Sequence, residues 1–374
     1  MSTIHWIDAQ PRSARWHSES GLPLPRRVVV ADDRMKAAVA YRLACEGTAL
    51  LWRGDFQNAR QLLRAMDRRV GRAAPGVAGT PAETFHLYRR FRAHRARVLG
   101  KLLVLLEEGY VLGLRRAPDV RPACSEAYGA YEASGPVAVA LTELLGVISA
   151  QQWREKGVYV PALEARVHPH YGVFAPTRGE YVDLVARAPL PRGGDVRTAF
   201  DLGTGTGVLA AVLARRGVGQ VVATDVSARA RECARDNVRR LGVELTVRVT
   251  GPELYPEGRA GLVVCNPPWL PARPASDLDL GVYDAGGGML QGFLDGLAGR
   301  LEPGGEGWLV LSDLAERLGL RSREELMAAV MGAGLRVVDR LDTRPRHGRV
   351  RDTDDPLHAV RAAEVTSLWR LAVA

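Results

Sequence analysis

The 374-residue sequence has few cysteines, few lysines and no long hydrophobic run. Its four cysteines lie far apart and none forms a CxxC pair, which argues against a zinc site or a disulfide framework and is typical of a reducing cytoplasm. No apolar run approaches the roughly 18 residues that span a bilayer, and the first residues lack the apolar core of a secretory signal. We therefore expect a cytoplasmic protein with no membrane partner and no metal ion.

Lysine is nearly absent, yet the chain is basic. The only lysines are Lys36, Lys101 and Lys156, and arginine supplies the rest of a net charge of +9. An excess of positive charge favours an acidic or nucleic-acid partner, such as the ribosome. A basic surface that contacts only solvent is an equally good explanation of the charge alone.

The first 165 residues are predicted to form a mainly helical domain. We expect this domain to recognise the substrate or to form a lid. Asp55 stands where it can cap a helix, Pro81 can open one, and residues 72–81 are a linker rich in Gly and Pro. The helical patterns cover the segments 34–52, 56–70, 81–108 and 137–153.

The pattern changes in the domain predicted for residues 166–374. Short apolar runs of strand type alternate with helical patterns, which predicts an α/β fold with a parallel sheet covered by helices on both faces. The last two apolar runs predict an antiparallel pair that closes one edge of the sheet. The predicted strands include the runs 198–203, 221–226, 245–250 and 261–265.

A glycine-rich segment, DLGTGTG at 201–207, follows a predicted strand and opens a helix. Glycine lets the backbone turn sharply and approach a ligand closely. Asp201 can face the cationic end of an amino-acid ligand, and Asp225, at the end of the next strand, can bind a ribose diol. A dinucleotide such as NAD shares the second feature, so this segment alone leaves a dehydrogenase open.

The sequence Asn266-Pro267-Pro268-Trp269 follows the fourth strand, at the carboxyl edge of the sheet where ligands bind in open α/β folds. The two prolines fix the backbone and remove two N–H donors, so the turn presents hydrogen-bond acceptors. Carbonyl oxygens and the side-chain oxygen of Asn266 suit a planar NH2 group, and Trp269 can stack on a flat amide or base. This turn therefore predicts transfer to a nitrogen held by positioning and electrostatics.

Together these motifs resemble class I S-adenosylmethionine-dependent methyltransferases with an (N/D)PP(Y/F/W) motif, the "methyltransferase small" group. The chain looks most like the HemK-type glutamine methyltransferases, because residues 172–185, Asn237 and the NPPWLP run also resemble that family. The resemblance covers roughly residues 166–374. It implies a Rossmann-like, seven-stranded, mostly parallel sheet whose last strand is antiparallel.

The resemblance also implies roles for individual residues, with S-adenosyl-L-methionine as the cofactor. The acceptor nitrogen is expected at the catalytic turn, Asn266, Pro267, Pro268 and Trp269. The residues expected at the cofactor are Phe174, Thr177, Asp201, Gly203, Thr204, Gly205, Gly207, Asp225, Val226 and Asn266. Trp269 departs from the usual tyrosine of the family and keeps its stacking surface but not its phenol hydroxyl.

The sequence alone does not identify the molecule that accepts the methyl group. A protein glutamine amide and an exocyclic amine of an RNA or DNA base fit the NPPW turn equally well. A small-molecule acceptor is a third possibility, and a catalytically idle RNA- or ribosome-binding protein on a methyltransferase scaffold is a fourth. The arginines of 89–97 and of 344–351 can contact phosphate or only water, and His168 and His170 lack a third metal ligand nearby.

Overall fold

The computed structural model describes residues 2–132, 134–191, 196–274, 278–346 and 352–374. The chain divides into two compact units. The N-terminal unit comprises Met1–Ala78 and Glu83–Gln152, and the C-terminal unit comprises Gly79–Ala82 and Trp153–Ala374. Within the described ranges, no helix combines the length and the apolar character needed to cross a membrane.

The N-terminal unit is an α/β structure around a six-stranded mixed sheet with the strand order β1-β2-β6-β5-β4-β3. Strands β3, β4 and β5 run parallel, whereas β5 and β6 are antiparallel. The strands are β1 (Thr3–Asp8), β2 (Gln10–Trp16), β3 (Arg27–Ala31), β4 (Thr48–Trp52), β5 (Leu102–Leu106) and β6 (Val137–Ala140). The helices are α1 (Ala37–Cys45), α2 (Phe56–Gly71), α3 (Pro81–Leu99), α4 (Arg121–Tyr128) and α5 (Leu141–Lys156), with a short 3-10 turn at Glu108–Tyr110.

This sheet corrects the prediction of a mainly helical region. Three predicted helices each contain a real helix joined to a buried strand: α1 with β4, α3 with β5, and β6 with α5. Every residue of β4, β5 and β6 is buried, so their sequences are unbroken apolar runs without the alternation of a half-exposed strand. Periodicity alone does not distinguish such a run from a buried piece of helix.

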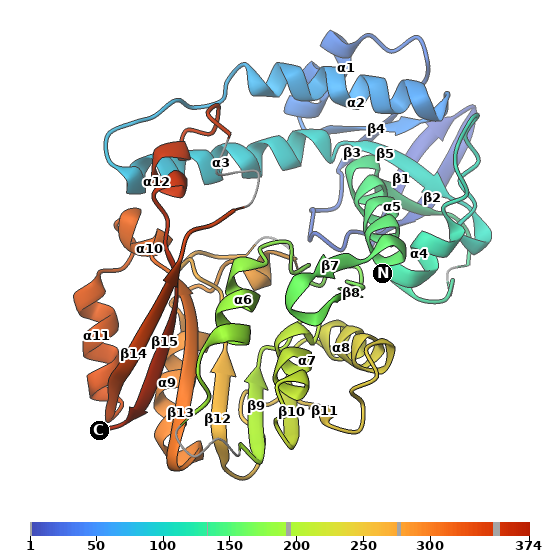
Figure 1. The fold of residues 1–374 in the computed structure, drawn as a ribbon. Coiled ribbons are helices and arrows are strands. Elements are labelled where there is room, and N and C mark those ends of the chain that lie inside the picture. Colours follow the sequence, from blue (N-terminus) through green and yellow to red (C-terminus); the bar gives the residue numbers. More distant parts are fainter. Residues whose placement is uncertain (1, 133, 192–195, 275–277, 347–351) are drawn as a thin grey trace. The chain divides into compact units, whose positions relative to one another are not determined.

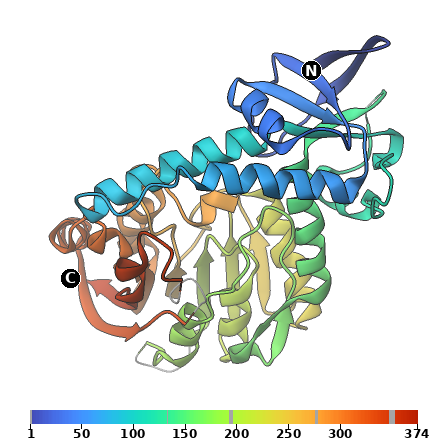
Figure 2. The same ribbon diagram turned by 90° about the horizontal axis from the view of Figure 1, so that it is seen from above.

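Two long helices of this unit, α2 and α3, lie side by side (Figure 2). Asp55 caps α2 as predicted, because its carboxylate accepts hydrogen bonds from the backbone N–H groups of Gln57 and Asn58. The two helices are joined by a bidentate ion pair in which the Arg95 guanidinium donates to both oxygens of Asp67, at 2.5 and 2.6 Å. Arg95 therefore holds one helix to another.

The C-terminal unit contains the predicted seven-stranded sheet, in the order β11-β10-β9-β12-β13-β15-β14 (Figure 1). The first five of these strands are parallel, and β15 runs antiparallel to both β13 and β14. The Rossmann-like prediction with an antiparallel last strand is confirmed. The strands are β9 (Thr198–Leu202), β10 (Gln220–Thr224), β11 (Val247–Thr250), β12 (Ala260–Cys265), β13 (Leu301–Ser312), β14 (Leu335–Thr343) and β15 (Thr366–Val373).

Helices cover both faces of this sheet. One apolar core joins the sheet to α6 and α7, and a second core joins the opposite face to α9 and α11. The helices are α6 (Glu180–Arg187), α7 (Val208–Arg215), α8 (Ala228–Arg240), α9 (Gly288–Arg300), α10 (Leu314–Arg317), α11 (Arg323–Gly332) and α12 (His358–Ala362). A small hairpin, β7 (Val158–Val160) and β8 (Ala165–Val167), precedes them, with 3-10 turns at Pro161–Leu163 and Leu278–Gly281.

Candidate active site

The glycine-rich segment 203–207, here called the glycine loop, joins β9 to α7 at the carboxyl edge of the seven-stranded sheet. Gly203, Gly205 and Gly207 all have positive φ angles, of 70°, 55° and 81°, which side chains other than glycine rarely adopt. Their surroundings differ. A Cβ on Gly203 would meet the Met289 side chain, whereas one on Gly205 would meet nothing within 4 Å. The loop therefore leaves open space at Gly205, where a ligand can approach the backbone.

Asp201 lies beneath this loop. Its side chain is buried, and its Oδ2 accepts hydrogen bonds from the Thr204 hydroxyl at 2.6 Å and from the Ala210 backbone N–H at 3.0 Å. Burial raises the pKa of Asp201 to about 6, because the desolvation cost outweighs these two hydrogen bonds. Asp201 does not line the cavity described below, so the structure places it as the support of the loop.

Asp225 follows β10 and lines the cavity. Its two carboxylate oxygens accept from the backbone N–H groups of Gly205, at 3.0 Å, and Ser227, at 2.9 Å. Burial raises the pKa of this carboxyl group, and the two backbone hydrogen bonds oppose the rise. Each oxygen keeps a free lone pair, so the carboxylate can still accept from the hydroxyls of a ribose.

The NPPW turn follows β12, as predicted. The indole N–H of Trp269 donates to the side-chain oxygen of Asn266 at 2.9 Å. Because an indole nitrogen only donates, this bond identifies the amide oxygen of Asn266 and fixes the rotation of its side chain. One lone pair of that oxygen remains for a substrate N–H.

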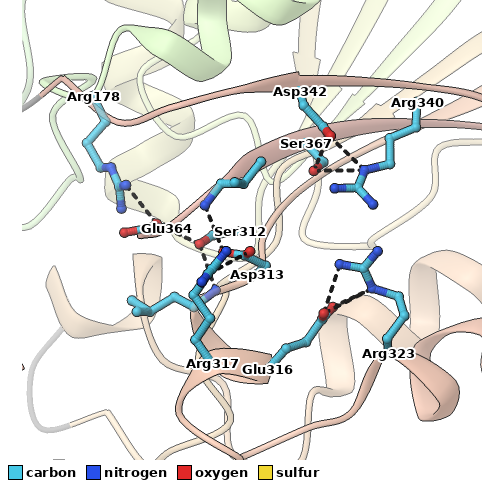
Figure 3. Close-up of polar contacts among 12 residues, drawn as sticks. Arg178, Ser312, Asp313, Glu316, Arg317, Arg323, Arg340, Asp342, Glu364 and Ser367 are labelled. Atoms are coloured by element: carbon cyan, nitrogen blue, oxygen red, sulfur yellow. Dashed lines mark hydrogen bonds and ion pairs between the residues drawn. The ribbon is translucent and has the colours of Figure 1, made fainter. Parts of the chain in front are cut away.

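One face of the Trp269 ring is covered by Arg178, whose guanidinium carbon lies 4.7 Å from the ring centroid. Arg178 itself donates to Glu180 at 3.0 Å and to Glu364 at 2.8 Å, and both carboxylates are buried. Glu364 also accepts from the Ser312 hydroxyl at 2.6 Å, as Figure 3 shows. Arg178, fixed by this network, covers one face of the Trp269 ring, so only the opposite face of the ring is left to contact a substrate.

A cavity of about 410 Å³ opens along this edge of the sheet. Eight of the predicted site residues line it: Phe174, Gly203, Thr204, Gly205, Asp225, Val226, Asn266 and Pro268. Five others do not: Thr177, Asp201, Gly207, Pro267 and Trp269. The structure thus brings the glycine loop, Asp225, and Asn266 and Pro268 of the NPPW turn to one cavity.

This cavity is also lined by residues that the sequence motifs did not indicate. They are Gly172, Val173, Tyr181, Thr206, Val208, Leu209, Thr224, Ser227, Ala230, Pro252, Glu253, Leu254, Leu280, Gly281 and Met289. A signal existed for Pro252, Glu253 and Leu254, because they follow β11 and the carboxyl ends of parallel strands share one edge. Met289 opens α9 and gave no comparable signal.

Asn237, a buried residue of α8, joins Thr206 of the cavity wall to His168, which does not line the cavity. Its amide oxygen accepts from the His168 backbone N–H at 2.7 Å, and its amide nitrogen donates to the Thr206 and His168 carbonyl oxygens at 3.1 Å. The His168 ring bonds to the Arg154 carbonyl oxygen and the His170 ring to Asp236. Across the described ranges, no three or more histidine, cysteine or acidic side chains gather as a metal site.

Residues 164–318 match the model of the methyltransferase small domain. This segment belongs to that family. The C-terminal unit is accordingly a class I S-adenosylmethionine-dependent methyltransferase domain with a Rossmann-like fold. The glycine loop, the open space at Gly205 and the Asp225 carboxylate fit this cofactor, and a cavity of this volume is of ordinary size for a small-molecule site.

Curated relatives carry the name ribosomal protein L11 methyltransferase. The protein from Pelotomaculum thermopropionicum is 36% identical over 146 residues, which cover 38% of this chain and 39% of the relative. The protein from Symbiobacterium thermophilum is 43% identical over 67 residues, covering 18% and 22%. The chain thus spans about two fifths or less of the length of these relatives.

Among solved structures, a methyltransferase from Geobacter sulfurreducens in complex with S-adenosyl-L-homocysteine is 18% identical, with a TM-score of 0.36. The comparison covers 56% of this chain and 94% of that one.

Proposed function

We propose that the protein is an S-adenosylmethionine-dependent N-methyltransferase that acts on a planar NH2 nitrogen of a macromolecule. The observation that carries the proposal is that Asn266 and Pro268 line the same cavity as the glycine loop and Asp225. The acceptor of the methyl group and the residues that hold the cofactor would then meet at one sheet edge.

The turn itself supplies the chemistry that such a nitrogen needs. The bound cofactor provides an electrophilic methyl group on a sulfonium centre. An amide or aromatic amine is a poor nucleophile, because its lone pair is delocalised. The side-chain oxygen of Asn266 accepts one N–H of the acceptor, and a backbone carbonyl of the rigid turn accepts the other. These two bonds favour a pyramidal, more electron-rich nitrogen and hold it for in-line attack.

Trp269 and Arg178 act in this proposal as positioning residues. The Trp269 N–H keeps the Asn266 oxygen directed as it is, and Arg178 holds the indole ring through its contact at 4.7 Å. Trp269 in place of a tyrosine therefore has a physical role that a phenylalanine cannot fill, because only the indole carries the N–H.

Two classes of acceptor remain: a protein glutamine amide and an exocyclic amine of a nucleic-acid base. The relatives named for a ribosomal protein and the net charge of +9 support a ribosomal setting for either class. In this proposal the N-terminal unit recognises the macromolecule. A small-molecule acceptor has no feature of the cavity in its favour.

Substitution at Asn266 tests the role of the turn. Asn266→Ala should reduce methyl transfer at least 100-fold, because the acceptor loses one of its two hydrogen bonds at the reacting nitrogen. Binding of S-adenosylmethionine, measured by calorimetry, should stay within a few-fold. Asn266→Asp is the matched control, since it keeps an acceptor oxygen and should retain more activity than the alanine variant. Near-normal turnover by Asn266→Ala would contradict the proposal.

The acceptor class is tested by incubating a cell lysate with the enzyme and radiolabelled cofactor, then digesting with protease or nuclease. Label released only by nuclease would exclude the glutamine acceptor, and label released only by protease would exclude the base. Trp269→Phe, which keeps the ring and loses the N–H, should lower turnover about 10-fold in the same assay.

A further inference from the structure

Nearly all of the net positive charge of the chain lies in one segment, residues 56–99. This segment contains α2 and α3 and has ten arginines, no lysine and two acidic residues. The rest of residues 1–152 has twelve basic and twelve acidic residues, and residues 153–374 have 29 basic against 28 acidic residues. The excess charge is therefore a local feature of two neighbouring helices.

Six of these ten arginines have no partner within the protein. Arg95 pairs with Asp67, and Arg60, Arg69 and Arg89 contact groups of their own helices. The other six are exposed and make no hydrogen bond, ion pair or ring contact with any residue that the structure describes. We call them the arginine surface: Arg64, Arg68, Arg72, Arg90, Arg92 and Arg97.

The part of this surface on α2 has a regular spacing. Arg64, Arg68 and Arg72 recur every four residues, so they lie along one side of α2 and of the residue that follows it. Four residues of helix rise about 6 Å, which places a positive charge at each turn of this side. Like charges at this spacing destabilise a helix, and a polyanion bound along it would remove the repulsion. The surface is thus suited to a partner with closely spaced negative charges.

The side chains of α2 and α3 favour a nucleic acid as this partner. The structure describes both helices throughout, and neither exposes a large apolar side chain. A helix that binds a membrane surface buries an apolar face among the headgroups, so these helices do not suit a membrane. Arginine can donate two parallel hydrogen bonds to a phosphate, and a nucleic-acid strand carries a phosphate at every nucleotide. The carboxylates of an acidic protein stand among neutral side chains and match this density less well.

We propose that the arginine surface binds the phosphate backbone of an RNA strand, independently of the RNA sequence. The choice of RNA rests on the proposed function, because an acceptor in a ribosomal setting lies beside RNA whether it is a base or a glutamine. RNA affinity is measured without cofactor or methyl transfer. A failure of RNA binding and a failure of catalysis at the NPPW turn are therefore separate results.

The experiment measures binding of a labelled oligouridylate about 20 nucleotides long to the full-length protein by fluorescence anisotropy at several salt concentrations. Arg90→Gln, Arg92→Gln and Arg97→Gln together should weaken binding about 10-fold at low salt. They should also lower the slope of log affinity against log salt by about 2, because each phosphate contact on a single strand contributes about 0.7. Unchanged affinity and slope would overturn the proposal.

Two further variants separate the arginine surface from other effects of the substitutions. Lysine at the same three positions of α3 keeps the charge and should bind within about 3-fold of the wild type. The matched control carries Arg197→Gln, Arg248→Gln and Arg336→Gln, three exposed arginines of the C-terminal unit that contact no described side chain. It loses the same charge and should bind within about 2-fold of the wild type. A lysine variant as weak as the glutamine variant, or a control as weak, would overturn the proposal.

The part of α2 is tested by adding Arg64→Gln, Arg68→Gln and Arg72→Gln to the α3 variant. The loss of slope should then reach about 4, because the contacts of the two helices add. Affinity equal to that of the α3 variant would overturn a surface formed by both helices. Without RNA, the melting temperature of each glutamine variant should not fall below that of the wild type, since the six side chains have no partner to lose.

Competition identifies the class of partner. Unlabelled oligouridylate should displace the labelled strand at about equal concentration, whereas polyglutamate of the same total charge should require at least about 10-fold more. Displacement by polyglutamate at equal charge would assign the surface to an acidic protein. Displacement by vesicles of phosphatidylcholine and phosphatidylserine in equal parts would assign it to a membrane, and tighter binding of single-stranded DNA would assign it to DNA. Each of these results would overturn the RNA proposal.

Discussion

The two units of this chain share an architecture and differ in where their charge and their glycines lie. Both pack helices on a sheet, but the N-terminal unit carries nearly all of the net positive charge, whereas the C-terminal unit is close to neutral. Three glycines with positive φ angles lie together at one strand end in the C-terminal unit, beside the buried Asp201 and the half-buried Asp225. This difference in charge is why we propose that the C-terminal unit carries the chemistry and the N-terminal unit the recognition of the acceptor.

The two cavities differ in the same way. The C-terminal cavity is formed largely by strand ends, the glycine loop and a rigid proline turn, where a small ligand can approach the backbone. A cavity of the N-terminal unit, at the end of β2 and the start of β6, is lined by the rings of Trp16, His17, Tyr110 and Tyr128 together with Arg15 and Glu132. Variants that affect one unit and spare the other therefore test the proposed division directly.

The largest effect is expected at Asp201. The folded-state pKa of about 6 lies above the ordinary value of 3.8, so this group stabilises the folded state below pH 3.8 and the contribution is lost as pH rises through 6. The difference corresponds to about 3 kcal/mol. Asp201→Asn keeps an oxygen for Thr204 and Ala210 and should remove this loss, so its stability relative to wild type should rise between about pH 4 and pH 7.

Urea unfolding of both proteins across that pH range measures the effect, with fluorescence and circular dichroism followed separately because the two units can unfold in separate transitions. Parallel stability profiles of variant and wild type would show that Asp201 is ionised in the folded protein as easily as in the unfolded chain.

A smaller effect is expected at Asp225. Asp225→Ala should weaken S-adenosylmethionine binding about 10- to 50-fold, because the carboxylate that accepts the ribose hydroxyls is lost and two backbone N–H groups lose their partner. Asp225→Asn keeps one acceptor oxygen, so its affinity for S-adenosylmethionine should lie between those of the wild type and Asp225→Ala. Isothermal titration calorimetry gives the affinities, and an unchanged value for the alanine variant would remove the ribose assignment.

The smallest effect is expected on the surface of α2. Arg64, Arg68 and Arg72 are exposed and lie four residues apart, from the middle of this helix to the residue that follows its end. Replacing all three with glutamine should weaken binding of a nucleic-acid acceptor several-fold at low salt and flatten its salt dependence, since each phosphate contact on a single strand contributes about 0.7 to the slope. Cofactor affinity should not change. A loss of cofactor binding would break the division between the units.

Much of the fold of the C-terminal unit could be predicted from local patterns in the sequence. Strand-type runs alternating with helical runs predicted the parallel sheet, and the rule that ligands bind at carboxyl strand ends correctly placed Gly203, Asp225 and Asn266 on one cavity. These features depend on residues close together in the chain, where glycine and proline leave few conformations.

The N-terminal sheet was missed for an equally physical reason. Strands β4, β5 and β6 are buried throughout, so their sequences lack the alternation that distinguishes a strand, and helical residues adjoin each of them. The aromatic cavity was also beyond prediction. Its rings come from positions as distant as 16 and 128, and no local spacing brings them together.

The sequence by itself determined the fold of the C-terminal unit, the cofactor loop and the position of the NPPW turn, because strand ends, glycines and prolines act over a few residues. Only the tertiary structure decided that Asp201 lies under the loop, that Arg178 covers a face of Trp269, and that four aromatic rings surround one cavity. Those facts depend on contacts between residues far apart in the chain, where packing and burial select among many arrangements that the local sequence permits.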